Sequence, residues 1–173
     1  MKSNRCLIAA VVVGLIVTAG SRGQEFPKPG PEHEMLKKME GTWDAKMTGM
    51  GMESKGTMVY KMELGGLFLT STFEGDFGGQ KFTGKGFDGY DSMKKKFVGV
   101  WVDSMSFSPM MMEGTYDKDK KQLTMTGEGP GLDGKPTKHK MVTEFKDADT
   151  MIMNMFMGDT KDPGFTIVFT RKK

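Results

Sequence analysis

The strand pattern at residues 97–104 constrains the fold more than any other stretch of the sequence. Its odd positions include Phe97, Trp101 and Asp103, and its even positions from 98 to 102 are all valine. Successive side chains of a strand point to opposite faces, so both faces of this strand are largely apolar. We therefore expect both faces to be covered by other parts of the chain, which requires a closed or two-layered sheet.

The same period of two recurs along most of the chain. Predicted strands cover residues 42–48, 57–63, 67–74, 81–90, 97–104, 110–116, 122–128, 137–146, 150–157 and 165–171. Short breaks rich in glycine and aspartate separate them, as in antiparallel hairpins. We predict an all-β fold, an antiparallel up-and-down barrel of about ten strands, because closure removes the two exposed edges of a sheet. A short helix at residues 31–40 should precede it, since Pro31 suits a first helical turn.

The N-terminus is typical of an export signal. Lys2 and Arg5 precede an apolar run at residues 7–19, which small residues follow. We expect a signal peptide at residues 1–23, a lead-in with the short helix at 24–40, and a barrel domain at 41–173. The apolar run is too short for a membrane anchor. The protein should therefore be exported, to the periplasm or outside the cell, with no membrane association after cleavage and without Cys6.

The charge balance gives no support for a nucleic-acid partner. The sequence has 25 basic and 22 acidic residues, but Lys2, Arg5 and Arg22 fall in the predicted signal, so the two signs balance in the remainder. A neutral domain lacks the basic surface that nucleic acids attract. No feature of the sequence predicts the oligomeric state.

The two ends of the predicted barrel domain carry a family signature. Gly41, Thr42 and Trp43 open the first strand directly after the helix, and this resembles the G-x-W opening of lipocalin-like, or calycin, barrels. In such barrels a C-terminal arginine stacks on the tryptophan and closes one end. Alternation places Arg171 on the apolar face of the last strand, so Trp43 and Arg171 should form this closure.

A closer resemblance extends over nearly the whole barrel domain. Its motifs are Glu32-His33, Gly41-Thr42-Trp43, a Gly-Tyr-Asp ending at Asp91, Trp101-Val102-Asp103-Ser104-Met105 and Thr170-Arg171-Lys172-Lys173. Together they resemble the bacterial domain-of-unknown-function family 1579. This resemblance implies a calycin-like barrel in bacterial, often exported, proteins. It implies no established activity and no catalytic residues.

Inward-facing aromatic and polar side chains are the candidates for a binding site. By alternation, Tyr90, Trp101 and Asp103 share one face of the 81–104 hairpin and could orient a small ligand. Alternatively, Trp101 is part of the core, and Asp103 with Ser104 caps the strand end. The full set of lumen candidates is Tyr60, Tyr90, Trp101, Asp103, His139, Met153 and Met155.

Methionine is the one compositional bias, with 19 residues in the chain. Thioethers bind Cu(I), and Met151, Met153, Met155 and Met157 lie on one strand face. Residues two apart on a strand are about 7 Å apart, which is poor spacing for a compact metal site. Methionine also fills irregular cores, and core filling explains the pattern better.

Motifs for catalysis or for a cofactor are weak. The chain has two histidines, and neither a nucleophile elbow nor a zinc-protease motif is present. Asp88, Asp91 and Asp103 lie close together in the hairpin, but aspartate is common in turns. His139 should face inward, either as a hydrogen-bonded rim residue or as an axial haem ligand. We expect no enzyme activity, metal or cofactor.

The function that the sequence favours is the binding of a small apolar or amphipathic molecule in the barrel lumen. Inward aromatic residues and flexible methionines can pack around varied shapes. Two alternatives stay open at this point. One is copper binding in the periplasm, and the other is a filled barrel that acts through its outer surface.

Overall fold

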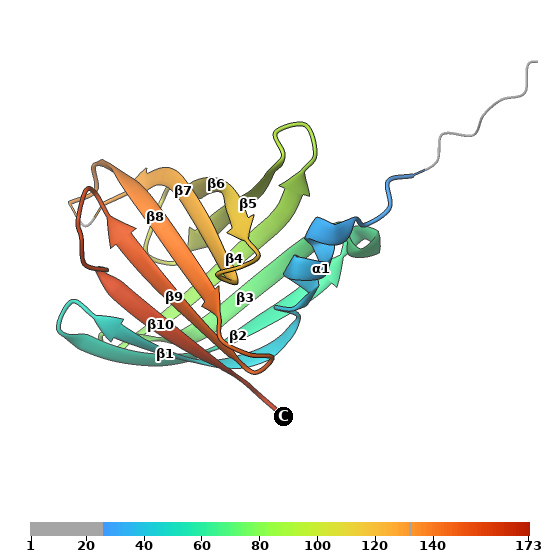
Figure 1. Ribbon diagram of the computed structural model, residues 1–173. Helices are drawn as coiled ribbons and strands as arrows, with labels where there is room; N and C mark the ends of the chain where they lie inside the picture. Colours follow the sequence, from blue (N-terminus) through green and yellow to red (C-terminus); the bar gives the residue numbers. More distant parts are fainter. Residues whose placement is uncertain (1–25, 132) are drawn as a thin grey trace, which may run out of the picture.

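Ten strands close into an antiparallel barrel in the computed structural model (Figure 1). The structure describes residues 26–131 and 133–173, so the predicted signal and Cys6 lie outside the described part. The elements are α1 (Pro31–Lys37), β1 (Gly41–Gly49), β2 (Met52–Glu63), a short 3₁₀ turn (Leu64–Gly66), β3 (Phe68–Phe77), β4 (Gln80–Asp91), β5 (Lys96–Asp103), β6 (Met110–Asp117), β7 (Gln122–Pro130), β8 (Pro136–Phe145), β9 (Thr150–Met157) and β10 (Phe165–Arg171).

Each strand pairs with the next one in sequence, and β10 pairs with β1 to close the ring. This topology confirms the predicted up-and-down barrel. The bounds of β9 and β10 are those that alternation predicts. β2 begins at Met52, earlier than predicted, because the β1–β2 turn needs only Met50 and Gly51, which have φ values of 51° and 74°. No helix among the described residues has the length and apolar character needed to span a bilayer.

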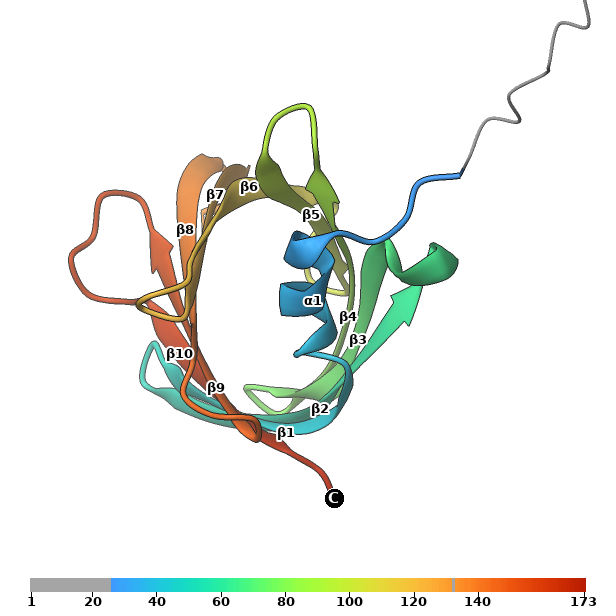
Figure 2. The same ribbon diagram turned by 45° about the vertical axis from the view of Figure 1, so that its right-hand side comes forward.

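One end of the barrel is filled by apolar side chains and covered by α1. The helix contacts β2, β3 and β4, and Figure 2 shows it at the opening of the barrel, on the side of β3 and β4. Its apolar face joins a continuous core of side chains from the strand ends nearest the helix. The buried members of this core include Met35, Leu36, Met39, Trp43, Leu69, Phe97, Leu123, Phe145, Met151 and Phe169.

Arg171 and Trp43 fasten the helix to this end. The guanidinium carbon of Arg171 lies 4.0 Å from the centroid of the Trp43 ring. Arg171 also donates hydrogen bonds to the carbonyls of Lys38 and Glu40, and Trp43 Nε1 donates to the carbonyl of Met39 at 2.7 Å. The predicted helix at residues 31–40 is therefore three residues too long, because these carbonyls accept bonds from the barrel and not from a further helical turn.

The expectation that both faces of the 97–104 strand are covered is wrong, because the outer face of β4, β5 and β6 is exposed. Val102, Phe87 and Met111 are 47%, 37% and 60% exposed. Phe87 stacks on Phe68 at a centroid distance of 4.8 Å, but no other described element lies over this surface. In a closed barrel only one face of each strand is turned to the interior. The inward residues of β5 are therefore enclosed, and its valines lie on the outside.

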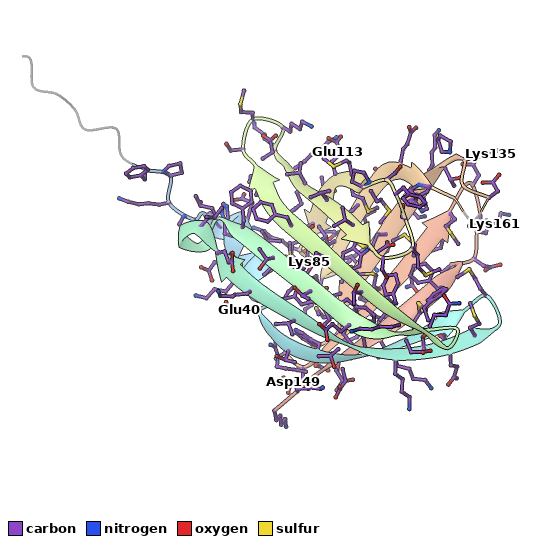
Figure 3. The ribbon with its side chains drawn as sticks, turned by 180° about the vertical axis from the view of Figure 1, so that it is seen from behind. Glu40, Lys85, Glu113, Lys135, Asp149 and Lys161 are labelled. Carbon is purple, nitrogen blue, oxygen red and sulfur yellow. The ribbon has the colours of Figure 1, made fainter. Side chains whose placement is uncertain are left out.

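Charged side chains also mark the outside of the barrel. Lys85 and Glu113, labelled in Figure 3, alternate with inward residues of β4 and β6. Glu113 forms ion pairs with Lys94 and Lys96, and the pKa of its carboxyl is lowered mainly by hydrogen bonds from these two lysines. These pairs are exposed, so they contribute little to stability.

Candidate functional site

The half of the lumen that lies away from α1 is less tightly filled than the helix end. Strand register places one apolar residue after another on its wall, and these side chains keep an intermediate exposure although they point inward. They include Phe73, Trp101, Met110, Met141, Met153 and Ile167. Solvent therefore reaches the inner wall of this half. A small ligand would meet aromatic and thioether surface there, which is typical of ligand sites in barrels.

Trp101 lies on a floor made by two glycines of β4. A β-carbon placed on Gly84 would overlap the six-membered ring of Trp101, and one placed on Gly86 would lie 3.2 Å from Trp101 Cε3. Gly86 is the register partner of Trp101 across the β4–β5 pair. The glycines therefore let the indole lie flat against the wall, and its exposed surface faces the lumen.

Asp103 holds the indole in this position. Trp101 Nε1 donates a hydrogen bond to Asp103 Oδ2 at 3.0 Å, and the backbone N–H of Met105 donates to Oδ1 at 2.9 Å. Both carboxylate oxygens thus accept a bond from the protein, one of them at the end of the strand. Asp103 positions Trp101 and caps the strand, which leaves it little capacity to bind a ligand directly.

The two tyrosines lie at the other end of the lumen from Trp101. Tyr90 packs edge-on against Phe97 and His33, at centroid distances of 5.2 and 6.4 Å. Phe97 and Trp101 are four residues apart on β5, or about 13 Å at the spacing of a strand. Tyr60 is 5% exposed within the core beneath the helix. Alternation correctly predicted that both tyrosines face inward, but the structure does not bring them together with Trp101.

Asp88 is a polar residue of the lumen that the sequence reasoning did not single out as a site. It faces inward on β4, between Leu69 on β3 and Gly99 on β5. A β-carbon on Gly99 would overlap Asp88 Oδ1, so the carboxyl lies over the glycine. No hydrogen bond or ion pair joins it to another described residue. Alternation in the sequence could have indicated this position, because it places Gly84, Gly86 and Asp88 on one face of the strand.

Burial raises the pKa of Asp88 to about 7. The side chain nevertheless keeps an intermediate accessible surface. Both observations agree if the carboxyl is surrounded by protein but borders a space that admits water. Burial, and secondly the Asp88 charge, raise the pKa of Tyr60, so its hydroxyl and the carboxyl share this interior environment.

His139, Met153 and Met155 lie on the opposite wall of the barrel. His139 is 7% exposed, and its Nε2 is 3.2 Å from the carbonyl of Pro130. Its Nδ1 is buried and has no partner among the described residues. Met155 is buried, whereas Met153 borders the accessible part of the lumen. The described residues contain no group of three or more His, Cys, Asp or Glu side chains suited to a metal.

Two shallow hollows lie on the outside of the barrel and are separate from these candidates. One, of about 600 Å³, runs over β6 to β9 beside Glu128, Lys138 and Phe156. The other, of about 390 Å³, lies over β1, β2 and β10 beside Lys55 and Val168. Their linings are mostly outward residues of the strands and loop residues, and His139 is the one predicted site residue at the edge of the first.

Comparison with protein families gives a match over most of the chain. Residues 28–171 match the family described as "Protein of unknown function (DUF1579)". The chain belongs to this family. The match confirms the resemblance that the Gly-Thr-Trp, Gly-Tyr-Asp and Trp-Val-Asp-Ser motifs indicated. A comparison with curated proteins finds no significant match.

Solved structures similar to this DUF1579 member include designed barrels. A redesigned beta barrel, b11L5F_LGL, is 16% identical, covers 80% of this chain and 96% of its own length, and gives a TM-score of 0.45. The redesigned beta barrel mFAP1, bound to DFHBI, is 16% identical, with coverages of 79% and 98% and a TM-score of 0.46.

Proposed function

We propose that the protein is exported and binds a small apolar or amphipathic molecule in the half of the lumen away from α1. The observation that carries the proposal is the setting of Trp101. Its indole is pinned by Asp103, lies on two glycines and still borders solvent inside the barrel. A rigid, partly exposed aromatic surface in a concave apolar site is a typical ligand platform.

The surrounding residues suit a ligand of variable shape. Met110, Met141 and Met153 line the accessible half together with Phe73 and Ile167. Methionine side chains are unbranched and polarisable, so they adapt to different apolar surfaces at low cost. The helix end of the barrel is filled, and a ligand would therefore enter from the opposite end. The export signal predicted at residues 1–23 supports a role outside the cytoplasm.

A fluorescence titration with the neutral probe N-phenyl-1-naphthylamine tests this proposal. We expect a saturable rise of probe fluorescence with the purified protein. Trp101→Ala should weaken binding about threefold to tenfold, since an aromatic contact contributes about 0.5–1.5 kcal/mol. Val102→Ala is the matched control, because Val102 is the next residue on β5 and faces outward. Absence of saturable binding, or equal weakening by both variants, would contradict the proposal.

A further inference from the structure

We infer that Asp88 selects lumen ligands that carry a cationic group, such as the ammonium of an amphipathic amine. This inference rests on the proposed function and adds to it the charge of the ligand. Asp88 points into the barrel from β4, and no described side chain satisfies its carboxyl. A carboxylate that protein largely surrounds, and that no protein group pairs, is costly, so its presence in the wall points to a partner that arrives from outside.

The charge inventory of the lumen supports this choice. By register, the inward positions of the ten strands hold the carboxylates Asp88 and Asp103 and one permanent cation, Arg171. Arg171 is occupied at the helix end by Trp43, by three carbonyls and by Asp149 at 3.4 Å. Asp103 accepts bonds from Trp101 and Met105. Asp88 is therefore the lumen carboxylate that accepts no hydrogen bond from a described residue and forms no ion pair with one.

The position of Asp88 also suits an amphipathic ligand. Its carboxyl lies over Gly99, and Trp101 follows two residues later on the same inward face of β5. The Met125 methyl group lies 3.7 Å from the position that a Gly99 β-carbon would take, so apolar surface borders the carboxyl. A ligand whose apolar body lies along Trp101 can place a cationic head at Asp88, deeper in the barrel.

Displacement of N-phenyl-1-naphthylamine at pH 8 by three ligands of equal chain length tests the inference. At this pH the Asp88 carboxyl is largely ionised and dodecylamine is still protonated. We expect dodecylammonium to displace the probe at concentrations about tenfold to a hundredfold lower than dodecanol, the range of one charge-assisted hydrogen bond. Dodecanoate should be the weakest of the three, because its charge repels the carboxylate.

Two variants assign the preference to Asp88. Asp88→Asn should abolish the advantage of the ammonium over the alcohol while probe binding persists. Asp91→Asn is the matched control on the same strand, since Asp91 accepts turn N–H bonds from Met93 and Lys94 that asparagine can also accept. Equal displacement by the three ligands, or a preference that survives in Asp88→Asn, would overturn the inference alone. Failure of the wild-type protein to bind the probe would overturn the proposed function as well.

Discussion

Replacement of Trp43 by alanine should lower the free energy of unfolding by about 3–5 kcal/mol. Trp43 is 1% exposed, donates to the Met39 carbonyl and carries the Arg171 guanidinium on its ring. Its removal leaves a large cavity and frees the contacts that fasten α1 to the barrel. A loss of this size is a large share of the stability of an ordinary domain. Urea unfolding followed by circular dichroism measures it.

The second tryptophan of the chain provides the comparison. Trp101→Ala should cost about 1–2 kcal/mol, since the indole keeps solvent contact and buries less apolar surface. A double-mutant cycle of Trp43→Ala with Arg171→Met should give a coupling energy of about 0.5–1 kcal/mol for the stacked pair. Equal losses for the two tryptophan variants would show that the helix end is not the main core.

Stability should fall as the pH rises from about 4 to about 8, and Asp88 should account for much of the fall. Its pKa is raised from 3.8 to about 7 in the folded protein, so the unfolded chain ionises first. Below about pH 3 both states hold the proton and Asp88 makes no difference to stability, and at pH 4 the difference is still small. At about pH 8 and above the folded protein carries nearly the full penalty, which is at most about 4 kcal/mol. Contact with solvent in the lumen reduces this to about 1–3 kcal/mol.

Asp88→Asn should therefore stabilise the protein at pH 8 and leave it nearly unchanged at pH 4. Urea unfolding at both values measures this difference. Asp117→Asn is a control of opposite sign, because hydrogen bonds from Lys120 lower the pKa of the exposed Asp117 carboxyl. Asp117 therefore stabilises at neutral pH and loses that effect as the pH falls. An Asp88→Asn variant with the pH profile of the wild type would show that the carboxyl is fully solvated.

The loss of stability that we expect from the ionised Asp88 carboxyl is also relevant to ligand binding. A carboxyl that destabilises the protein at neutral pH has no role in the fold that the described contacts explain. Binding of a cation to it would recover the lost stability by mass action. The stability data and the ligand preference thus test one side chain by independent routes.

Alternation along the sequence predicted the barrel because side-chain parity follows directly from strand geometry. The turn residues between strands made the hairpins visible, and the bounds of β9 and β10 needed no tertiary information. The outer face of β5 shows the limit of this reasoning. A row of valines predicts a covered surface, but whether a face is covered depends on the other elements, and Val102 is 47% exposed.

Alternation also predicted which site residues face inward, but it could not predict their positions along the barrel axis. Tyr90 and Trp101 face the same lumen, yet the register places Tyr90 beside Phe97 and Trp101 beside Gly86. Asp88 was considered only together with Asp91 and Asp103 and was set aside, because an aspartate near a turn is usually a turn residue. Its inward position followed from the alternation, whereas its lack of a partner depends on all the neighbouring strands and could be seen only in the folded barrel.

The proposed function places a small apolar or amphipathic molecule in the accessible half of the lumen. The most direct measurement is a titration of methyl-¹³C-methionine-labelled protein with N-phenyl-1-naphthylamine, followed by NMR. Ring currents of the bound probe should shift the methyl signals of Met110, Met141 and Met153, which line this half. The signals of Met93 and Met111, 94% and 60% exposed on the outside, should stay in place. Shifts confined to Met93 or Met111, or no shift of the three inward methionines, would contradict binding in the lumen.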